Sequence, residues 1–303
     1  MNAAKLVRST LCVAIIAACT RETRVPVPPP PQRLADAPDQ FIQIDGVRLH
    51  YRDAGRGDPV LLIHGYTGSI DLWAVTDSGT ISLADSLSRD HRVIALDLRG
   101  YGQSTKLGDV AQYGHKMTDD VARLIERLKL GRTHLIGHSL GALLAVNVAE
   151  RYPDRVASLS LLAGMFFRDS ATFATWSNRW ASELEATHGM TKFLQWVFPG
   201  MDSATAAGVS AEVIAHNDLP ALIASMRSMP LLVLSLGPAP SMPTFVAVGA
   251  DDPFAPQSRE LVSRWPSVQH VETPATNHMQ IINRPEVLKG IRSLVTATRP
   301  AAR

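Results

Sequence analysis

Cysteine is nearly absent from this sequence of 303 residues. Both cysteines, Cys12 and Cys19, lie close to the N-terminus, so the rest of the chain contains no disulfide and no Cys/His cluster of the kind that binds zinc. The phosphate-binding pattern G-x-x-x-x-G-K-[ST] is also missing. The sequence therefore predicts a protein that uses neither a metal nor an organic cofactor.

The sequence also lacks a large excess of charge of either sign, and it lacks long apolar runs. The chain holds 30 Lys and Arg against 28 Asp and Glu, and Lys5 and Arg8 account for the excess. This balance argues against a polyanionic partner such as nucleic acid. The apolar run at residues 11–18 is much shorter than the roughly 20 residues of a membrane-spanning helix. Apolar residues still make up 46% of the chain, enough for a substantial core.

The first residues are typical of an export signal. Lys5 and Arg8 precede the short apolar run, which ends in "IAAC" at residues 16–19. Two small residues before a cysteine resemble the cleavage box of bacterial lipoproteins, which implies a signal peptide over residues 1–18 and a lipid on Cys19. A plain secretory signal with an incidental cysteine is the alternative.

A proline-rich stretch follows over residues 19–39. Prolines favour the extended polyproline conformation, which spaces domains rather than packing, so we interpret this stretch as a tether. Thr20 follows the cysteine in place of the aspartate associated with inner-membrane retention in enteric bacteria. The resemblance therefore implies an exported protein held on a membrane by its lipid anchor, with the outer membrane favoured.

From residue 40 onward, strand patterns alternate with helix patterns. A hairpin signal at Asp45-Gly46 joins two short strands, and a helix is expected over residues 119–131 with acids at its start and Gly131 at its end. Apolar runs without polar alternation, typical of strands covered on both faces, occur at residues 59–65, 92–98, 133–137, 156–164, 243–252 and 267–272. This order predicts an α/β fold with a mostly parallel central sheet flanked by helices.

Residues 166–240 interrupt the alternation with a helical pattern rich in aromatic residues and methionine. We predict a helical cap inserted into a core formed by residues 40–165 and 241–298. Such side chains pack with one another, but a cap over the carboxyl edge of a sheet also lines an apolar pocket.

The stretch "GHSLG" places Ser139 between Gly137 and Gly141, after an apolar strand pattern and before an apolar helix pattern. The motif resembles the nucleophile elbow of the α/β-hydrolase superfamily. A sharp strand-to-helix turn needs small neighbours, and it exposes the serine beside a helix N-terminus that favours negative charge. Ser139 is therefore the candidate nucleophile.

Two further loops resemble those of the same superfamily. His64-Gly65, at the end of the strand pattern at 59–65, resembles the oxyanion loop, so Tyr66 and Leu140 are implied as the two backbone N–H donors. We expect His64 to be a buried structural histidine, because the loop needs its backbone rather than its imidazole. The D-x-R-G-x-G-x-S pattern at 97–104 implies a bracing role for its aspartate and arginine.

The remaining catalytic candidates follow the cap. "GADDPFAP" resembles the superfamily's acid loop and selects Asp252, with Asp251 as the rival and Asp169 as a weaker one. His278 follows the last strand pattern; Asn277 stands where family members often have glycine, and we expect it to tolerate the left-handed conformation. The histidines of the cap, at positions 188 and 216, are expected to be ordinary surface or lining residues.

The order serine, aspartate, histidine is the one expected for this fold. The resemblance implies a serine hydrolase without cofactor that cleaves carboxylic esters of a small-molecule acyl substrate through an acyl-enzyme on Ser139. Serine at the elbow disfavours haloalkane dehalogenases and epoxide hydrolases, which use aspartate there. Carbon–carbon bond hydrolases, cofactor-free perhydrolases and a non-catalytic binding protein on the same fold remain open. The sequence does not identify the acyl group, the alcohol or the oligomeric state.

Overall fold

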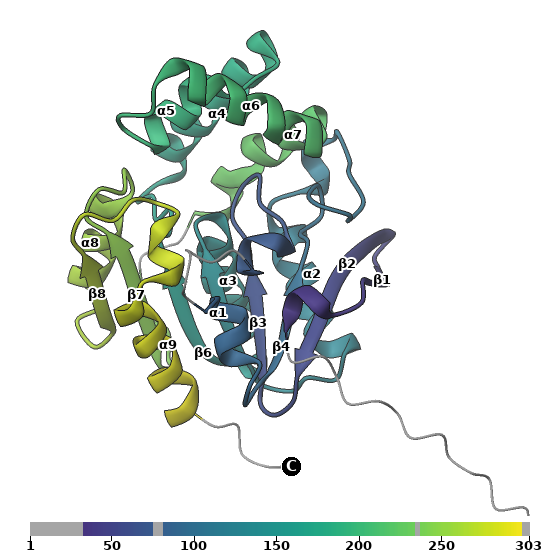
Figure 1. Cartoon of the computed structure of the whole chain (residues 1–303), viewed down its shortest axis with the longest axis vertical. Coiled ribbons are helices and arrows are strands. Elements are labelled where there is room, and N and C mark those ends of the chain that lie inside the picture. The colour runs from purple at the N-terminus through teal and green to yellow at the C-terminus, as the bar shows by residue number, and fades with distance from the viewer. Residues whose placement is uncertain (1–32, 75–80, 234–236, 299–303) are drawn as a thin grey trace, which may run out of the picture.

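The computed structural model describes residues 33–74, 81–233 and 237–298 (Figure 1). Its central element is an eight-stranded sheet in the order β1-β2-β4-β3-β5-β6-β7-β8. The strands are β1 (Gln40–Ile44), β2 (Val47–Gly55), β3 (Pro59–Ile63), β4 (Arg92–Leu96), β5 (Thr133–His138), β6 (Val156–Leu162), β7 (Thr244–Gly249) and β8 (Gln269–Thr273). Strand β2 pairs antiparallel with β1 and β4, and the other pairs are parallel. The predicted α/β architecture with a mostly parallel sheet is confirmed.

Helices cover both faces of the sheet because its central strands are buried on both sides. On one face, α2 (His115–Arg127), α3 (Leu140–Arg151) and α8 (Ala255–Arg264) contribute to a large apolar cluster. On the other face, α1 (Leu83–Leu87) and α9 (Pro285–Ala297) contribute to a second cluster. The connections between these elements contain short 3-10 turns: η1 (Leu34–Asp36), η2 (Ile70–Ala74), η3 (Val110–Gln112), η4 (Pro153–Arg155) and η6 (Gln280–Asn283).

Between β6 and β7 the chain leaves the sheet and forms a helical layer, seen at the top of Figure 1. This layer, which we call the cap, consists of α4 (Ser170–Thr187), α5 (Thr191–Val197), α6 (Ser203–His216), α7 (Leu219–Ser228) and the turn η5 (Met229–Leu232). Aspartates accept backbone N–H groups at the N-termini of α4, α6 and α7, a usual way to begin a helix.

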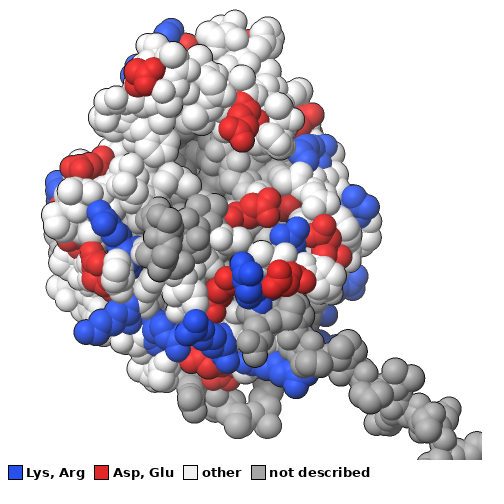
Figure 2. Space-filling view, in the orientation of Figure 1, with Lys and Arg blue, Asp and Glu red and all other residues white. Residues whose placement is uncertain are grey.

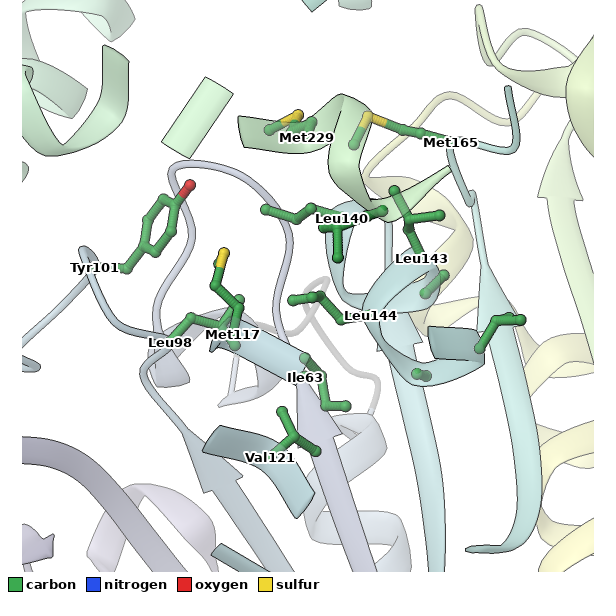
Figure 3. Close-up of a cluster of buried hydrophobic side chains, with 14 of the residues drawn as sticks. Ile63, Leu98, Tyr101, Met117, Val121, Leu140, Leu143, Leu144, Met165 and Met229 are labelled. Atoms are coloured by element: carbon green, nitrogen blue, oxygen red, sulfur yellow. The ribbon is translucent and has the colours of Figure 1, made fainter. Parts of the chain in front are cut away.

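The core meets the cap above the start of α3. In Figure 3, Met229 of η5 and Met165, which follows β6, lie over Leu140 and Leu143 of α3. All four side chains are at most 2% exposed. The apolar cluster of that face of the sheet therefore continues into the cap.

Two expectations about element ends need correction. Helix α2 begins at His115, earlier than expected, because Gly114 turns the chain at φ 64°. The tether was expected to extend over residues 19–39, but its C-terminal end was placed too far along the chain. Within its described part, Leu34 is fully buried, and its N–H donates to Asp85 Oδ1 over 3.2 Å. An apolar side chain seated in the core means that the folded part starts before residue 40.

The predicted signal peptide, Cys19 and most of the tether fall outside the described residues. Among the residues that are described, no helix combines the length and the apolar character needed to cross a membrane.

Candidate active site

Ser139 sits at a sharp turn between the end of β5 and the start of α3. Its φ is 55°, a left-handed value that non-glycine residues rarely adopt, and its N–H donates to Leu162 O over 2.9 Å. A Cβ atom on Gly137 would overlap the backbone of Gly141, and one on Gly141 would overlap the carbonyl of Ile63. Both glycines are therefore required by contact between backbones, and the strained serine is held in place on both sides.

Asp252 and His278 follow the neighbouring parallel strands β7 and β8, so both lie at the carboxyl edge of the sheet. His278 Nδ1 donates to Asp252 Oδ2 over 2.9 Å, and Asp252 Oδ1 accepts the Phe254 N–H, also over 2.9 Å. The two residues are 6% and 3% exposed. With the proton on Nδ1, the Nε2 atom of His278 is free to accept another proton.

The rival acids lie elsewhere. Asp251 is exposed, whereas its neighbour Asp252 is buried against His278. Asp169 is exposed too, and its carboxylate accepts the Thr172 N–H at the start of α4 over 2.7 Å. Asp169 is therefore a helix cap, and the geometry favours Asp252 as the partner of His278.

The loop after β3 brings Gly65 against the nucleophile. A Cβ atom at Gly65 would stand 3.0 Å from Ser139 Cβ, so the absence of a side chain allows the close approach. Within the described part of the chain, the N–H groups of Tyr66 and Leu140 have no protein acceptor. Tyr66, which follows Gly65, lines the same cavity as Ser139, and Leu140 directly follows the serine.

His64 holds this loop from inside the protein. Its Nδ1 donates to Gly65 O over 2.7 Å, and its Nε2 accepts the Leu98 N–H over 3.1 Å. Burial lowers the pKa of this fully enclosed imidazole. A neutral ring with both nitrogens occupied matches the structural role expected for it.

Asp97 and Arg99 brace the surroundings of the loop. Asp97 accepts the Ile70 N–H over 2.8 Å and the Gln103 N–H over 2.7 Å, and His50 Nδ1 lies 2.7 Å from Asp97 Oδ2. Burial alone raises the pKa of Asp97, but these hydrogen bonds hold it below its usual value. Arg99 is buried in a two-pronged contact with Asp120 at 2.5 and 2.6 Å.

Ser139 and His278 open into one cavity of about 190 Å³ between the core and the cap. Its walls are mostly apolar. Methionines contribute from several elements: Met165, Met190, Met226, Met229 and Met279. Aromatic rings contribute as well: Trp176, Phe193, Phe198 and Phe254. No arginine or lysine is found among the described residues that line it. The expected apolar pocket beneath the cap is present.

Comparisons with known proteins agree with this geometry. Residues 58–206 match the family model described as "alpha/beta hydrolase fold". A thermophilic esterase from Thermogutta terrifontis superimposes with a TM-score of 0.69 at 26% identity, over 87% of this chain and 100% of the esterase. These findings confirm the α/β-hydrolase superfamily.

Curated relatives of this α/β-hydrolase match over shorter segments. The dihydrolipoyllysine-residue acetyltransferase component of the acetoin cleaving system of Pseudomonas putida is 36% identical over 41% of this chain and 32% of its own length. The 2-hydroxymuconate semialdehyde hydrolase of a Pseudomonas species is 33% identical over 40% of this chain and 42% of its own length. The chain thus spans less than half the length of these relatives.

The cap of the α/β-hydrolase is tied directly to the loops of the site. Tyr66 donates its hydroxyl to Leu222 O in α7 over 3.0 Å, and the hydroxyls of Tyr101 and Ser225 lie 2.6 Å apart. Figure 3 shows the Tyr101 hydroxyl pointing toward the cap. The oxyanion loop therefore has one partner in the core, through His64, and one in the cap.

The histidine loop differs from expectation at Asn277. The left-handed residue is Ala275, with φ 47°, and Asn277 does not adopt this conformation. The Asn277 side chain instead accepts the N–H groups of Met279 over 3.1 Å and Gln280 over 3.0 Å. Asparagine thus stabilises the turn through its side chain rather than through an unusual backbone.

Sequence reasoning gave no role to His138, whose Nε2 lies 2.9 Å from the carbonyl oxygen of His278. No sequence signal points to this contact, because its acceptor is a backbone atom that every residue carries. The cap histidines lie outside the site: His188 follows the last residue of α4 in a left-handed conformation with φ 50°, and His216 Nδ1 donates to Glu212 O on the surface over 2.8 Å.

Proposed function

We propose that this protein is a serine hydrolase that cleaves carboxylic esters through an acyl-enzyme on Ser139. The observation that carries the proposal is the arrangement of the elbow serine and the buried His278–Asp252 pair around one apolar cavity. A serine hydroxyl is a weak nucleophile by itself, and a base oriented by a carboxylate is the usual means of activating it.

In the proposed reaction, His278 Nε2 takes the proton of Ser139 as its Oγ attacks the ester carbonyl. The imidazolium then gives this proton to the leaving alcohol, and the acyl group stays on Ser139. Water, deprotonated by His278, then attacks the acyl carbon. His278 returns this proton to Ser139 Oγ as the bond between Oγ and the acyl carbon breaks, and the acid is released. Asp252 holds the imidazole in the required tautomer and stabilises its charged form throughout.

The N–H groups of Tyr66 and Leu140 are the proposed donors to the oxyanion. Tyr66 follows Gly65, which closely approaches Ser139, and Leu140 follows Ser139 directly. Neither N–H has a protein acceptor in the described structure, so both are available for the negative charge that forms. Losing one donor of this kind commonly costs about 3 kcal/mol of transition-state stabilisation.

The cavity favours an uncharged, apolar acyl group. A buried apolar cavity of about 150 Å³ admits benzene, so about 190 Å³ accepts a group of that size or slightly larger. An anionic substrate needs a compensating cation, and the described lining offers neither arginine nor lysine.

Carbon–carbon bond hydrolysis is the second candidate, because a relative at 33% identity is named 2-hydroxymuconate semialdehyde hydrolase. That name specifies a substrate that bears a carboxylate. The absence of a lining cation therefore supports esters over such compounds. Cofactor-free perhydrolysis and a binding role without turnover are the further alternatives.

Two measurements test the proposal. An active-site phosphonate should label the wild-type protein on Ser139 and leave Ser139→Ala unlabelled, which separates a catalyst from an inert binder. A panel of uncharged acyl esters, ring-cleavage diketones and peroxide with a carboxylic acid then separates the three reactions. Turnover of the diketones without turnover of any ester would overturn the ester assignment.

We also propose that the protein is exported and anchored by lipid on Cys19, with the outer membrane favoured. The motivation is the short apolar run that ends in "IAAC". Mass spectrometry of the mature N-terminus is the test: diacylglyceryl modification of Cys19 is expected. An unmodified N-terminus at any other residue would rule out the anchor.

A further inference from the structure

His138 is the last residue of β5 and directly precedes Ser139, yet the reaction proposed above gives it no part. Its side chain is 2% exposed and borders the same cavity as Ser139 and His278. Its Nε2 atom lies 2.9 Å from the main-chain carbonyl oxygen of His278. Because a carbonyl oxygen only accepts, Nε2 must carry the proton and donate it to this bond.

The ring of His138 lies close to two loops of the site, the oxyanion loop after β3 and the loop that carries His278. Its centroid lies 4.8 Å from that of His278, with the two rings tilted by 53°. On the other side, a Cβ atom at Gly65 would stand 3.2 Å from His138 Nδ1. The ring therefore touches both the oxyanion loop and the loop of the base.

We propose that His138 is a positioning residue: its Nε2–H holds the main chain of His278 and so sets the separation between the Ser139 hydroxyl and the His278 imidazole. This inference rests on the proposed serine hydrolase function. His138 does not touch the reacting atoms; it acts through the backbone of the base.

The histidine loop needs such a contact because it follows β8, the edge strand of the sheet. Thr276 O accepts the Asp251 N–H over 3.1 Å, which ties the loop to the end of β7 and the side of the acid. Among the described residues, His138 alone makes a hydrogen bond from β5 to this loop. Since β5 also carries the nucleophile, this bond fixes the base relative to the serine rather than relative to the acid.

The charge state of His138 suits this role. Burial, and after it the charge of nearby His278, lowers the pKa of His138 to about 3. The ring is therefore neutral at neutral pH and keeps one N–H for the carbonyl. A neutral ring also avoids repelling the imidazolium that His278 becomes during each turnover.

The test compares two amides that differ by one methylene. In His138→Gln, the amide N–H reaches about as far as Nε2 of the histidine, and the bond to His278 O can form. In His138→Asn, the same group is too short to reach. We expect His138→Asn to lower kcat for an acyl ester by about 10- to 100-fold, with KM changed less than threefold, because a small displacement of a catalytic group has effects of this size. His138→Gln should recover most of the loss.

Phosphonate labelling of Ser139 gives a second readout, and its rate should fall in parallel with kcat in His138→Asn. Wild-type kcat in His138→Asn would overturn the proposal, as would equal losses in both amide variants or a rise in KM alone. If His138→Asn does not fold, His138→Leu replaces it as the variant without a donor. A wild-type protein that neither labels nor cleaves any ester would overturn the proposed function instead, and the inference with it.

Discussion

The core and the cap of this protein hold their side chains by different means. In the core, hydrogen bonds and backbone contacts fix the candidate catalytic groups: Gly137 and Gly141 confine the turn that carries Ser139, and Asp252 holds His278. In the cap, methionines and aromatic rings face the cavity, and they are held by packing. The two regions also differ at the surface: Figure 2 shows most charged side chains of this face on the core and few on the cap.

This difference separates two tasks. Chemistry needs atoms placed within fractions of an ångström, which directional bonds and close backbone contacts provide. Accommodation of an acyl group needs shape and apolar area, and flexible thioethers adapt to several shapes. We therefore expect changes in the core to affect turnover and changes in the cap to affect substrate preference.

The largest effect is expected at the nucleophile. Ser139→Ala removes the atom that attacks the carbonyl in the proposed reaction, and loss of a catalytic serine has lowered kcat by about 10⁶-fold in a serine protease. Ester turnover by purified variant, with circular dichroism to verify folding, is the measurement. Activity near the wild-type level would show that chemistry does not occur at the elbow.

The second largest effect is expected at the acid Asp252, and the neighbouring Asp251 provides a matched control. Asp252→Asn leaves His278 in the wrong tautomer, and the corresponding change in a serine protease cost about 10⁴-fold in kcat. Asp251→Asn alters an exposed side chain and should change kcat less than threefold. A reversal of the two effects would assign the catalytic carboxylate to residue 251.

The cap should determine the preferred acyl length. Each methylene buried in the cavity contributes about 0.8 kcal/mol, so kcat/KM should rise about fourfold per carbon until the cavity is full, and then fall. Phe198→Ala removes a half-buried ring from the lining. It should move the preferred acyl length to longer chains and change kcat/KM for acetyl esters little. An optimum that stays unchanged, or a preference for charged esters, would contradict the assignment of this pocket.

The smallest effect is expected at His50 in the core, away from the reacting atoms, and it concerns the stability of the fold rather than turnover. Burial alone lowers the pKa of His50, but its contacts with Asp97 and Asp39 raise it above the usual value. A raised pKa in the folded state means that protonated His50 stabilises the fold at acidic pH, and that this stabilisation is lost as pH rises past about 6.5 toward the raised value.

His50→Gln removes this titrating group. The melting temperature of wild type should exceed that of the variant most at about pH 5.5, and the difference should narrow by about pH 8.5. A gap that widens with pH would mean that His50 is neutral in the folded protein.

The sequence anticipated the strands of the core better than the ends of its helices. Short apolar runs such as residues 59–65 and 133–137 predicted strands, because a parallel sheet is buried on both faces. The helix containing Asp119 was misjudged at its start, because Gly114 supplies the turn while Asp120 pairs with Arg99 inside the protein. A carboxylate near the start of a helical pattern indicates the N-terminus of the helix only when it does not pair with a residue elsewhere in the fold.

By itself, the sequence determined the candidates for nucleophile, acid and base, because the loops that resemble those of the superfamily are local patterns around Ser139, Asp252 and His278. Only the tertiary structure decided which groups meet: the His138 N–H with the His278 carbonyl, and the Tyr66 hydroxyl with Leu222 O in the cap. The physical reason is that both acceptors are main-chain oxygens. Every residue carries one, so no residue type marks the partner, and folding alone selects it.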